Sequence, residues 1–196
     1  MEKVLYVTPQ ALQVDSFRLG MKVVQSDFRP DLMIALWRGG APIGLYVHEA
    51  LRLHGIQTDH IAIRTSRYTA PGKANAEIVV HNLGYVREQI DAHDHTERPY
   101  NILIVDDVWE SGGSIKAVLD RLREEIAKGP DQKRALDIRF ATLFFKPACN
   151  KTPYIPNFYV RTVDEHVWIN FPHELEGLDD IRKVMGDEVA NALFLK

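Results

Sequence analysis

Short apolar runs alternate with amphipathic helical stripes along most of this chain, and this alternation constrains the fold more than any other feature of the sequence. Apolar runs at residues 31–37, 102–105 and 138–145 predict strands that are buried on both faces. Helical spacing at residues 43–51 and 115–126 follows the first two of these runs. Strand, helix and strand in turn predict an α/β fold in which helices cover a mainly parallel sheet.

Both ends of the chain add to this pattern. Residues 4–7 predict a short strand, and Thr8-Pro9 is typical of a helix start, with threonine at the N-cap and proline at the first helical position. Apolar residues at spacings of three and four then predict the buried face of a helix: Val14, Phe17, Met21, Val24 and Phe28. A second stripe of this kind predicts a final helix: Leu178, Ile181, Met185 and Val189.

The middle of the chain is less regular. Residues 56–64 and 78–80 predict two further strands. Residues 65–76 between them are rich in small and polar side chains and predict a long loop, a kind of segment that is usually functional or disordered.

Composition excludes several classes of protein. The 196 residues suit a single domain, and 24 Lys and Arg against 27 Asp and Glu give a formal charge of −3. This charge favours neither nucleic acid nor an acidic membrane, so we expect neither as a partner. No apolar run is long enough to span a bilayer, and residues 1–10 lack the pattern of a secretory signal. Cys149 is the only cysteine, which excludes an internal disulfide and favours a reducing compartment, so we expect a cytoplasmic protein.

The densest chemistry follows the apolar run at 102–105. Asp106 and Asp107 stand at the expected strand end, where adjacent carboxylates suit a divalent cation or a pair of sugar hydroxyls. The sequence Ser-Gly-Gly-Ser at 111–114 then opens a helix. Its glycines let backbone N–H groups approach a phosphate, and its serines add hydroxyl donors. The alternative is a surface turn followed by an ordinary helix cap, which the preceding apolar strand disfavours.

This segment resembles the binding signature for phosphoribosyl pyrophosphate (PRPP) in type I phosphoribosyltransferases. The resemblance implies that Asp106 and Asp107 hold the ribose hydroxyls and influence bound Mg²⁺, a cation that prefers oxygen ligands shared with substrate phosphates. It also implies that Ser111, Gly112, Gly113 and Ser114 cradle the 5′-phosphate. Glu110 stands where 6-oxopurine enzymes carry an aspartate that handles the proton on purine N7. An ordinary helix-start carboxylate is the alternative.

Two further segments resemble PRPP-binding parts of the family. Arg38, Gly39 and Gly40 follow a buried strand and resemble the pyrophosphate loop of bacterial xanthine-guanine enzymes, in which glycine amides and an arginine bind the leaving group. A generic tight turn is the alternative. Ser66, Arg67 and Tyr68 resemble a lid with a Ser-Tyr pair, although Arg67 intervenes between the two. A lid would exclude water from the reaction, and a mobile surface loop is the alternative.

The purine-binding side is carried by residues after 140. Lys146 resembles the strand-end lysine that contacts the 6-oxo group, and a lysine donor disfavours the amino group of adenine. Trp168 and Ile169 resemble the segment that stacks on the purine and meets its edge through the backbone. A core position is the alternative for Trp168. Glu174 is a weaker candidate for assisting the metal.

Taken over the chain, the resemblance implies a five-stranded, mainly parallel sheet with a small hood. The core would span about residues 30–150, and the hood would combine the N-terminal segment with residues from about 151–196. The implied activity is purine salvage: transfer of the phosphoribosyl group to hypoxanthine, guanine or xanthine, in a homo-oligomer (dimer or tetramer). Two alternatives remain open: an enzyme for another base, such as a pyrimidine, and a PRPP-sensing regulator without turnover.

Overall fold

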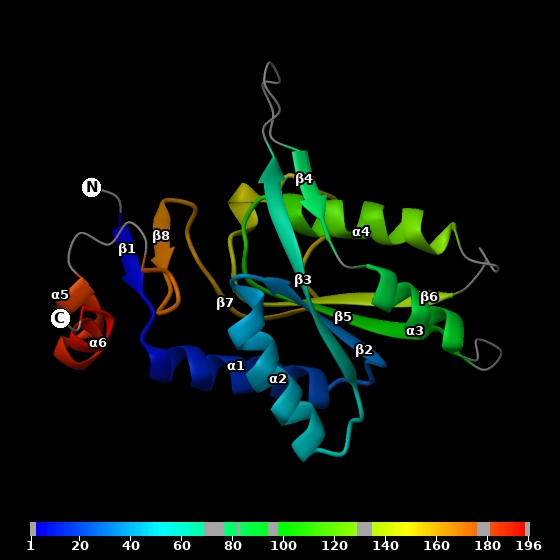
Figure 1. Ribbon diagram of the computed structural model, residues 1–196, viewed down its shortest axis with the longest axis horizontal. Coiled ribbons are helices and arrows are strands. Elements are labelled where there is room, and N and C mark those ends of the chain that lie inside the picture. The colour runs from blue at the N-terminus through cyan, green and yellow to red at the C-terminus, as the bar shows by residue number, and fades with distance from the viewer. Residues whose placement is uncertain are drawn as a thin grey trace.

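A six-stranded sheet forms the centre of the molecule in the computed structural model, which describes residues 3–68, 77–81, 83–93, 98–128, 135–175 and 181–194 (Figure 1). The strand order is β4-β3-β2-β5-β6-β7. Their bounds are β2 (Leu32–Trp37), β3 (Asp59–Tyr68), β4 (Glu77–Val80), β5 (Tyr100–Trp109), β6 (Leu136–Phe145) and β7 (Phe158–Thr162). Five of these strands run parallel and β4 joins the edge antiparallel, so the predicted five-stranded parallel sheet is confirmed.

Helices cover both faces of this sheet because its central strands are apolar on both sides. In β2, Met33 packs in one core cluster with residues of α1 (Pro9–Val24) and α2 (Gly40–Leu53). Leu32, Ile34 and Leu36 point the other way and pack with α3 (Gly84–Ala92) and α4 (Gly113–Ile126). Alternate side chains of one strand therefore serve two cores, as expected for a parallel sheet that is buried on both faces.

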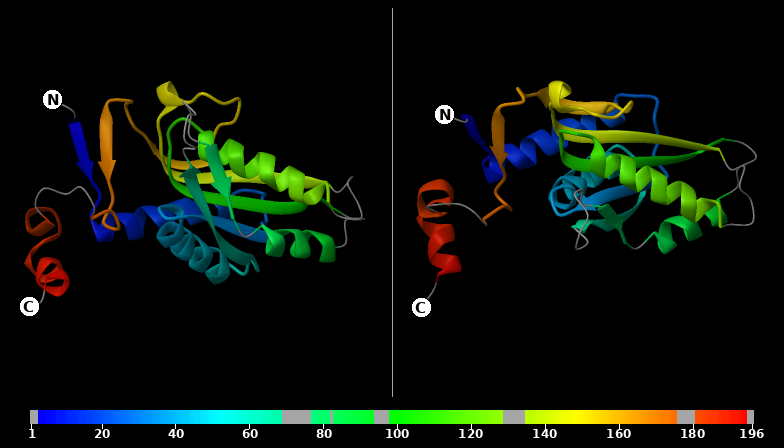
Figure 2. Two further views of the ribbon diagram at one scale, coloured as in Figure 1. Left: turned by 45° about the horizontal axis from the view of Figure 1, so that its top comes forward. Right: turned by 90° about the horizontal axis from the view of Figure 1, so that it is seen from above.

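A second, two-stranded sheet lies at one end of the molecule. It pairs β1 (Lys3–Tyr6) in parallel with β8 (Val167–Asn170), and the short helices α5 (Ile181–Met185) and α6 (Asp187–Leu193) lie at the same end (Figures 1 and 2). We call β1 and β8 the hood pair. The chain after residue 151 thus divides, because β7 extends the main sheet and β8 joins the hood pair.

Two strands continue further than the sequence predicted. The predicted strand at 102–105 was too short, because β5 stays paired with β6 as far as Trp109 opposite Phe145. Asp106 and Asp107 are therefore fixed by a strand. The predicted loop at 65–76 was also wrong in its first four residues, because β3 continues to Tyr68 in antiparallel pairing with β4. Residues 69–76 lie outside the described residues.

The helices at the two ends also differ from prediction. Helix α1 begins as expected, with the Thr8 hydroxyl accepting a hydrogen bond from the Ala11 N–H, but the predicted buried stripe was wrong in its first two residues. Phe28 is buried as predicted, although it lies beyond the end of α1, and Val24 is partly buried against the core. Val14 and Phe17 are 39% and 38% exposed, and Leu12, Leu19 and Val23 face the core instead. Asp15 shares this inner face, where Arg18 and Arg161 pair with its carboxylate. At the other end, Gly186 at φ 88° separates α5 from α6, so the predicted single helix is broken there. Residues 178–180 lie outside the described residues.

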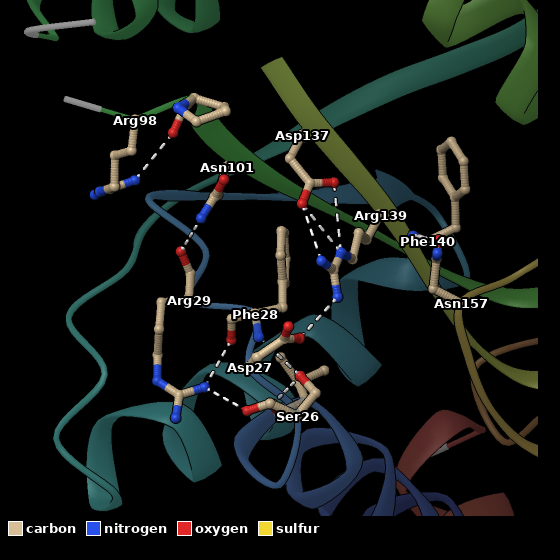
Figure 3. Close-up of polar contacts among 12 residues, drawn as sticks. Ser26, Asp27, Phe28, Arg29, Arg98, Asn101, Asp137, Arg139, Phe140 and Asn157 are labelled. Atoms are coloured by element: carbon tan, nitrogen blue, oxygen red, sulfur yellow. Dashed lines mark hydrogen bonds and ion pairs between the residues drawn. The ribbon is translucent and has the colours of Figure 1, made fainter. Parts of the chain in front are cut away.

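Polar contacts close the sheet at the amino ends of its strands (Figure 3). The Arg139 guanidinium bonds to Asp137 and Asp27 and lies 4.5 Å from the centre of the Phe28 ring. The Asn101 amide donates to the Arg29 carbonyl at 2.8 Å. Within the described part of the chain, no helix is long and apolar enough to cross a membrane.

Candidate active site

A cavity of about 310 Å³ lies at the carboxyl ends of β2, β5 and β6, the edge where open parallel sheets bind ligands. It brings together most of the side chains that the sequence singled out. They are Arg38, Asp106, Asp107, Glu110, Ser111, Gly112, Gly113, Ser114, Lys146, Trp168, Ile169 and Glu174.

The acidic pair forms one wall of the cavity. The Asp107 carboxylate accepts a hydrogen bond from the Val108 N–H at 2.7 Å, and that of Asp106 accepts from the Asp107 N–H at 3.1 Å. Burial raises the pKa of the Asp106 carboxyl, and the neighbouring Asp107 charge raises it further. A Cβ on Gly39 would come within 1.8 Å of the Asp107 carboxylate, so a larger residue at position 39 would displace the Asp107 side chain.

The loop after β2 lies directly on the end of β5. A Cβ on Gly40 would meet the Val105 carbonyl oxygen at 2.3 Å, so this position requires glycine. The peptide bond between Trp37 and Arg38 is cis, and the Arg38 side chain is exposed at the cavity. The guanidinium and the acidic pair therefore line the same cavity.

The loop after β5 leads into α4 through a left-handed residue. Gly112 has φ 73°, and the Ser111 hydroxyl accepts from the Gly113 N–H at 3.3 Å. A Cβ on Gly112 would lie 2.5 Å from the Thr152 hydroxyl, so Thr152 packs closely against this loop. Helix α4 directs its N-terminus at the cavity, which favours an anion such as phosphate.

The far end of the cavity carries a buried ammonium group and an exposed ring. Lys146 is 5% exposed, and its Nζ donates to Glu110 Oε1 at 2.9 Å. Trp168 on β8 is 60% exposed and Ile169 beside it is 7% exposed. The indole is therefore available to a ligand, which argues against the core alternative.

The three lid candidates lie on β3. Ser66, Arg67 and Tyr68 pair through their backbones with β4, and only the backbone of these residues is described. The neighbouring Thr65 does line the cavity. The role of a lid stays a prediction.

The model of the phosphoribosyl transferase domain family matches residues 15–178 of this chain. The chain belongs to this family. The match includes all the candidate residues of the cavity. No curated protein matches the chain.

Solved structures place this phosphoribosyltransferase among relatives of the same fold. A hypothetical protein from Neisseria gonorrhoeae with bound ppGpp is 21% identical, with a TM-score of 0.66 over 94% of this chain and 96% of its own. The purine phosphoribosyltransferase from Pyrococcus horikoshii Ot3 is 22% identical, with a TM-score of 0.64 over 92% and 99%. The xanthine-guanine-hypoxanthine phosphoribosyltransferase of Helicobacter pylori is 21% identical, with a TM-score of 0.60 over 88% and 95%. These likenesses show that the chain shares the fold of these proteins.

The family resemblance implies magnesium, and the donors at this phosphoribosyltransferase's cavity fit a hard cation. Asp106, Asp107 and Glu174 offer carboxylate oxygens, the ligands that Mg²⁺ prefers. Asp107 and Glu174 belong with His173 to a group whose ligand atoms all lie within 4.8 Å of one another.

Sequence reasoning missed two residues of the phosphoribosyltransferase site. His173 joins Asp107 and Glu174, but a single histidine in an irregular segment gives no metal-ligand spacing. Asn150 lies behind the phosphate loop, where its side-chain oxygen accepts from the Trp109 indole N–H at 3.2 Å and from the Thr152 hydroxyl at 3.1 Å. Glycine at 112 was the available signal, since a left-handed glycine often marks close contact with another segment.

Proposed function

We propose that this phosphoribosyltransferase acts in purine salvage and transfers the 5-phosphoribosyl group of PRPP to hypoxanthine, guanine or xanthine. The observation that carries the proposal is the ion pair between buried Lys146 and exposed Glu110 at one end of the cavity. It sets a hydrogen-bond donor beside a hydrogen-bond acceptor. A 6-oxopurine with hydrogen on N7 presents the complementary pair: an oxo acceptor beside an N–H donor.

PRPP would occupy the other side of the cavity. Ser111 to Ser114 and the N-terminus of α4 would hold the 5′-phosphate, Asp106 and Asp107 the ribose hydroxyls, and Arg38 with Gly39 the pyrophosphate. Bound magnesium would neutralise charge on the pyrophosphate. The close approach of Gly39 to Asp107 supports this arrangement, because it puts ribose and leaving group side by side.

The purine would lie between Trp168 and the ribose. Its N9 forms the bond to C1′ while the bond from C1′ to the pyrophosphate oxygen breaks and that oxygen keeps the electron pair. Glu110 accepts the N7 proton as positive charge develops on the base. Lys146 donates to the 6-oxo group, and the fixed charges act mainly by orientation and electrostatic stabilisation.

Three further properties belong to this proposal. The protein would work in the cytoplasm, as a dimer or tetramer, with a core near residues 30–150 and a hood built from the remaining segments. The hood pair supports the last point, since β1 and β8 meet beside the cavity through Trp168 and Ile169.

A base panel tests the proposal. The protein is mixed with PRPP, Mg²⁺ and one base at a time, and pyrophosphate release is measured. We expect turnover with at least one of the three oxopurines and little or none with adenine, because Lys146 would oppose its amino group with a second donor. Faster turnover with adenine or a pyrimidine would overturn the substrate class.

The rival is a regulator that binds PRPP without turnover. The Neisseria gonorrhoeae relative was solved with bound ppGpp, a nucleotide with two pyrophosphate groups, so the fold can hold such a ligand. Saturable PRPP binding, with no release of pyrophosphate in the presence of any base, would favour the regulator.

A further inference from the structure

One side of the cavity holds three metal-binding side chains from two distant parts of the chain. Asp107 comes from β5, and His173 and Glu174 follow β8. One ligand atom from each lies within 4.8 Å of the others, and His173 Nε2 is 3.8 Å from Asp107 Oδ2. The 3.8 Å between His173 and Asp107 suits two ligands that each lie about 2.0–2.2 Å from one metal ion.

The two ring nitrogens of His173 lack the hydrogen bonds that buried nitrogens normally make, although the side chain as a whole is 19% exposed. Both ring nitrogens are buried and neither has a hydrogen-bond partner among the described residues. The ring stacks on Phe171 at 5.3 Å with an interplanar angle of 16°, and Phe171 is only 2% exposed. The ring plane is therefore fixed by the core. A buried polar atom without a partner indicates a missing ion or water, and here a carboxylate stands opposite it.

The two carboxylates are held in place as well. Asp107 Oδ1 accepts from the Val108 N–H, and Glu174 Oε2 accepts from the Phe171 N–H at 3.3 Å. Each carboxylate retains a second oxygen for another partner. The group therefore offers one imidazole nitrogen and two carboxylate oxygens. Each of the three side chains is held by a hydrogen bond or by ring stacking.

We propose that Asp107, His173 and Glu174 form a protein-based site for a divalent transition-metal ion, which binds before PRPP and is preferred over Mg²⁺. The preference follows from the imidazole, because nitrogen ligands favour the later first-row metals and Mg²⁺ favours oxygen alone. Gly39 lies against Asp107, so the ion would sit beside the proposed pyrophosphate position. That catalytic placement rests on the proposed function, whereas binding of the ion rests on the three side chains.

Co²⁺ binding to the full-length protein without PRPP or purine tests the proposal. The visible absorption of Co²⁺ reports its ligands, and a titration reports stoichiometry and affinity. We expect one Co²⁺ per chain that millimolar Mg²⁺ does not displace. His173→Gln should weaken Co²⁺ binding at least about 10-fold and change the absorption spectrum, since loss of a supporting or direct metal contact typically costs 10–100-fold. Glu174→Gln should also weaken binding.

His166→Gln is the matched control, because His166 lies in the same part of the chain but is 83% exposed and pairs with Glu165. It should bind Co²⁺ like the wild type. Circular dichroism shows whether each variant is folded, and His173→Asn replaces His173→Gln if the latter is not. Wild-type affinity and spectrum in a folded His173 variant would overturn the site, as would absence of Co²⁺ binding to the wild type. Turnover with Mg²⁺ is a separate measurement, so this site and the proposed function can fail independently.

Discussion

Two oppositely charged side chains define the purine end of the cavity. Lys146 is almost fully buried and Glu110 is its acceptor, while the Glu110 side chain is itself 57% exposed. A buried ammonium group needs such a partner, because removal from water is costly without one. The Glu110 side chain is one methylene longer than the aspartate of the 6-oxopurine enzymes. Its carboxylate still lies at the base-binding end of the cavity, because it contacts Lys146 directly.

Glu110→Gln tests the proposed proton transfer. The amide can still accept a hydrogen bond from Lys146 but is a very weak base, so we expect kcat to fall about 10²–10⁴-fold with the KM for PRPP nearly unchanged. Glu110→Asp should keep much of the activity. Glu124→Gln on the exposed face of α4 is the control and should leave kcat unchanged. Full kcat in Glu110→Gln would mean that the proton leaves by another route.

Trp168→Ala tests the stacking surface. Stacking on an aromatic ring is worth roughly 1–3 kcal/mol, so the KM for the purine should rise about 5–150-fold. The KM for PRPP should change much less. Because the indole is 60% exposed, the melting temperature should shift little. A large loss of stability with unchanged purine affinity would instead assign Trp168 to packing.

At the scale of elements, the segment between β6 and β7 supports the phosphate loop. It begins with the short 3₁₀ helix η1 (Pro147–Cys149), and its Lys151 N–H donates to the Ser111 carbonyl at 3.1 Å. Asn150 organises the segment, since its amide also donates to the carbonyls of Thr152 and Tyr154. The phosphate loop is thus held from behind by an element that does not line the cavity itself.

Asn150→Leu should therefore weaken PRPP binding through the loop. The change leaves several hydrogen-bonding groups without a partner, each at a cost of about 1–3 kcal/mol, and we expect the KM for PRPP to rise on the order of 10-fold. The KM for the purine should change less. Asn157→Leu removes an acceptor of the Phe140 N–H away from this loop and serves as the control. Equal effects of the two variants on PRPP would contradict the supporting role.

The elements that sequence predicted well are those whose burial pattern is local. The strands around Ile34 and Ile104 appear in the sequence as apolar runs. The Asp-Asp pair and the Ser-Gly-Gly-Ser loop could be recognised because their residues are close together in the sequence. Strand β7 and the extended ends of β3 and β5 depend on distant pairing partners, which no local pattern shows. The inner face of α1 was misread for the same reason, because buried Asp15 is matched by Arg161 far along the chain. His173 likewise acquires neighbours only through the fold.

At the scale of the whole molecule, Asp31 connects the amino ends of β2 and β5. It lies just before β2, and its carboxylate accepts from the Arg98 guanidinium at 2.5 Å and from the Asn101 N–H at 2.9 Å. Burial alone raises the pKa of Asp31, but these hydrogen bonds outweigh it and hold the pKa below the usual 3.8. The ionised form is therefore favoured by folding.

This pKa shift predicts an acid dependence of stability. A carboxyl group with a depressed pKa contributes stability that is complete above its unfolded value of 3.8 and is lost as the pH falls through the lower folded value. The melting temperature of Asp31→Asn should thus lie below that of the wild type at pH 7, and the difference should narrow below about pH 4. Asp27→Asn, at a side chain that is 90% exposed, is the control. A difference that stays constant down to pH 3 would contradict the assignment.

The hood pair has a consequence for the order in which the two sides of the cavity fold. Its register pairs Lys3 with Val167, so β1 is synthesised long before its partner β8. The segments proposed to hold PRPP end within α4, and they are synthesised before Lys146 and Trp168. Because long-range strand pairing forms slowly and domains begin to fold during synthesis, we expect the base side of the cavity, which requires β8, to form last.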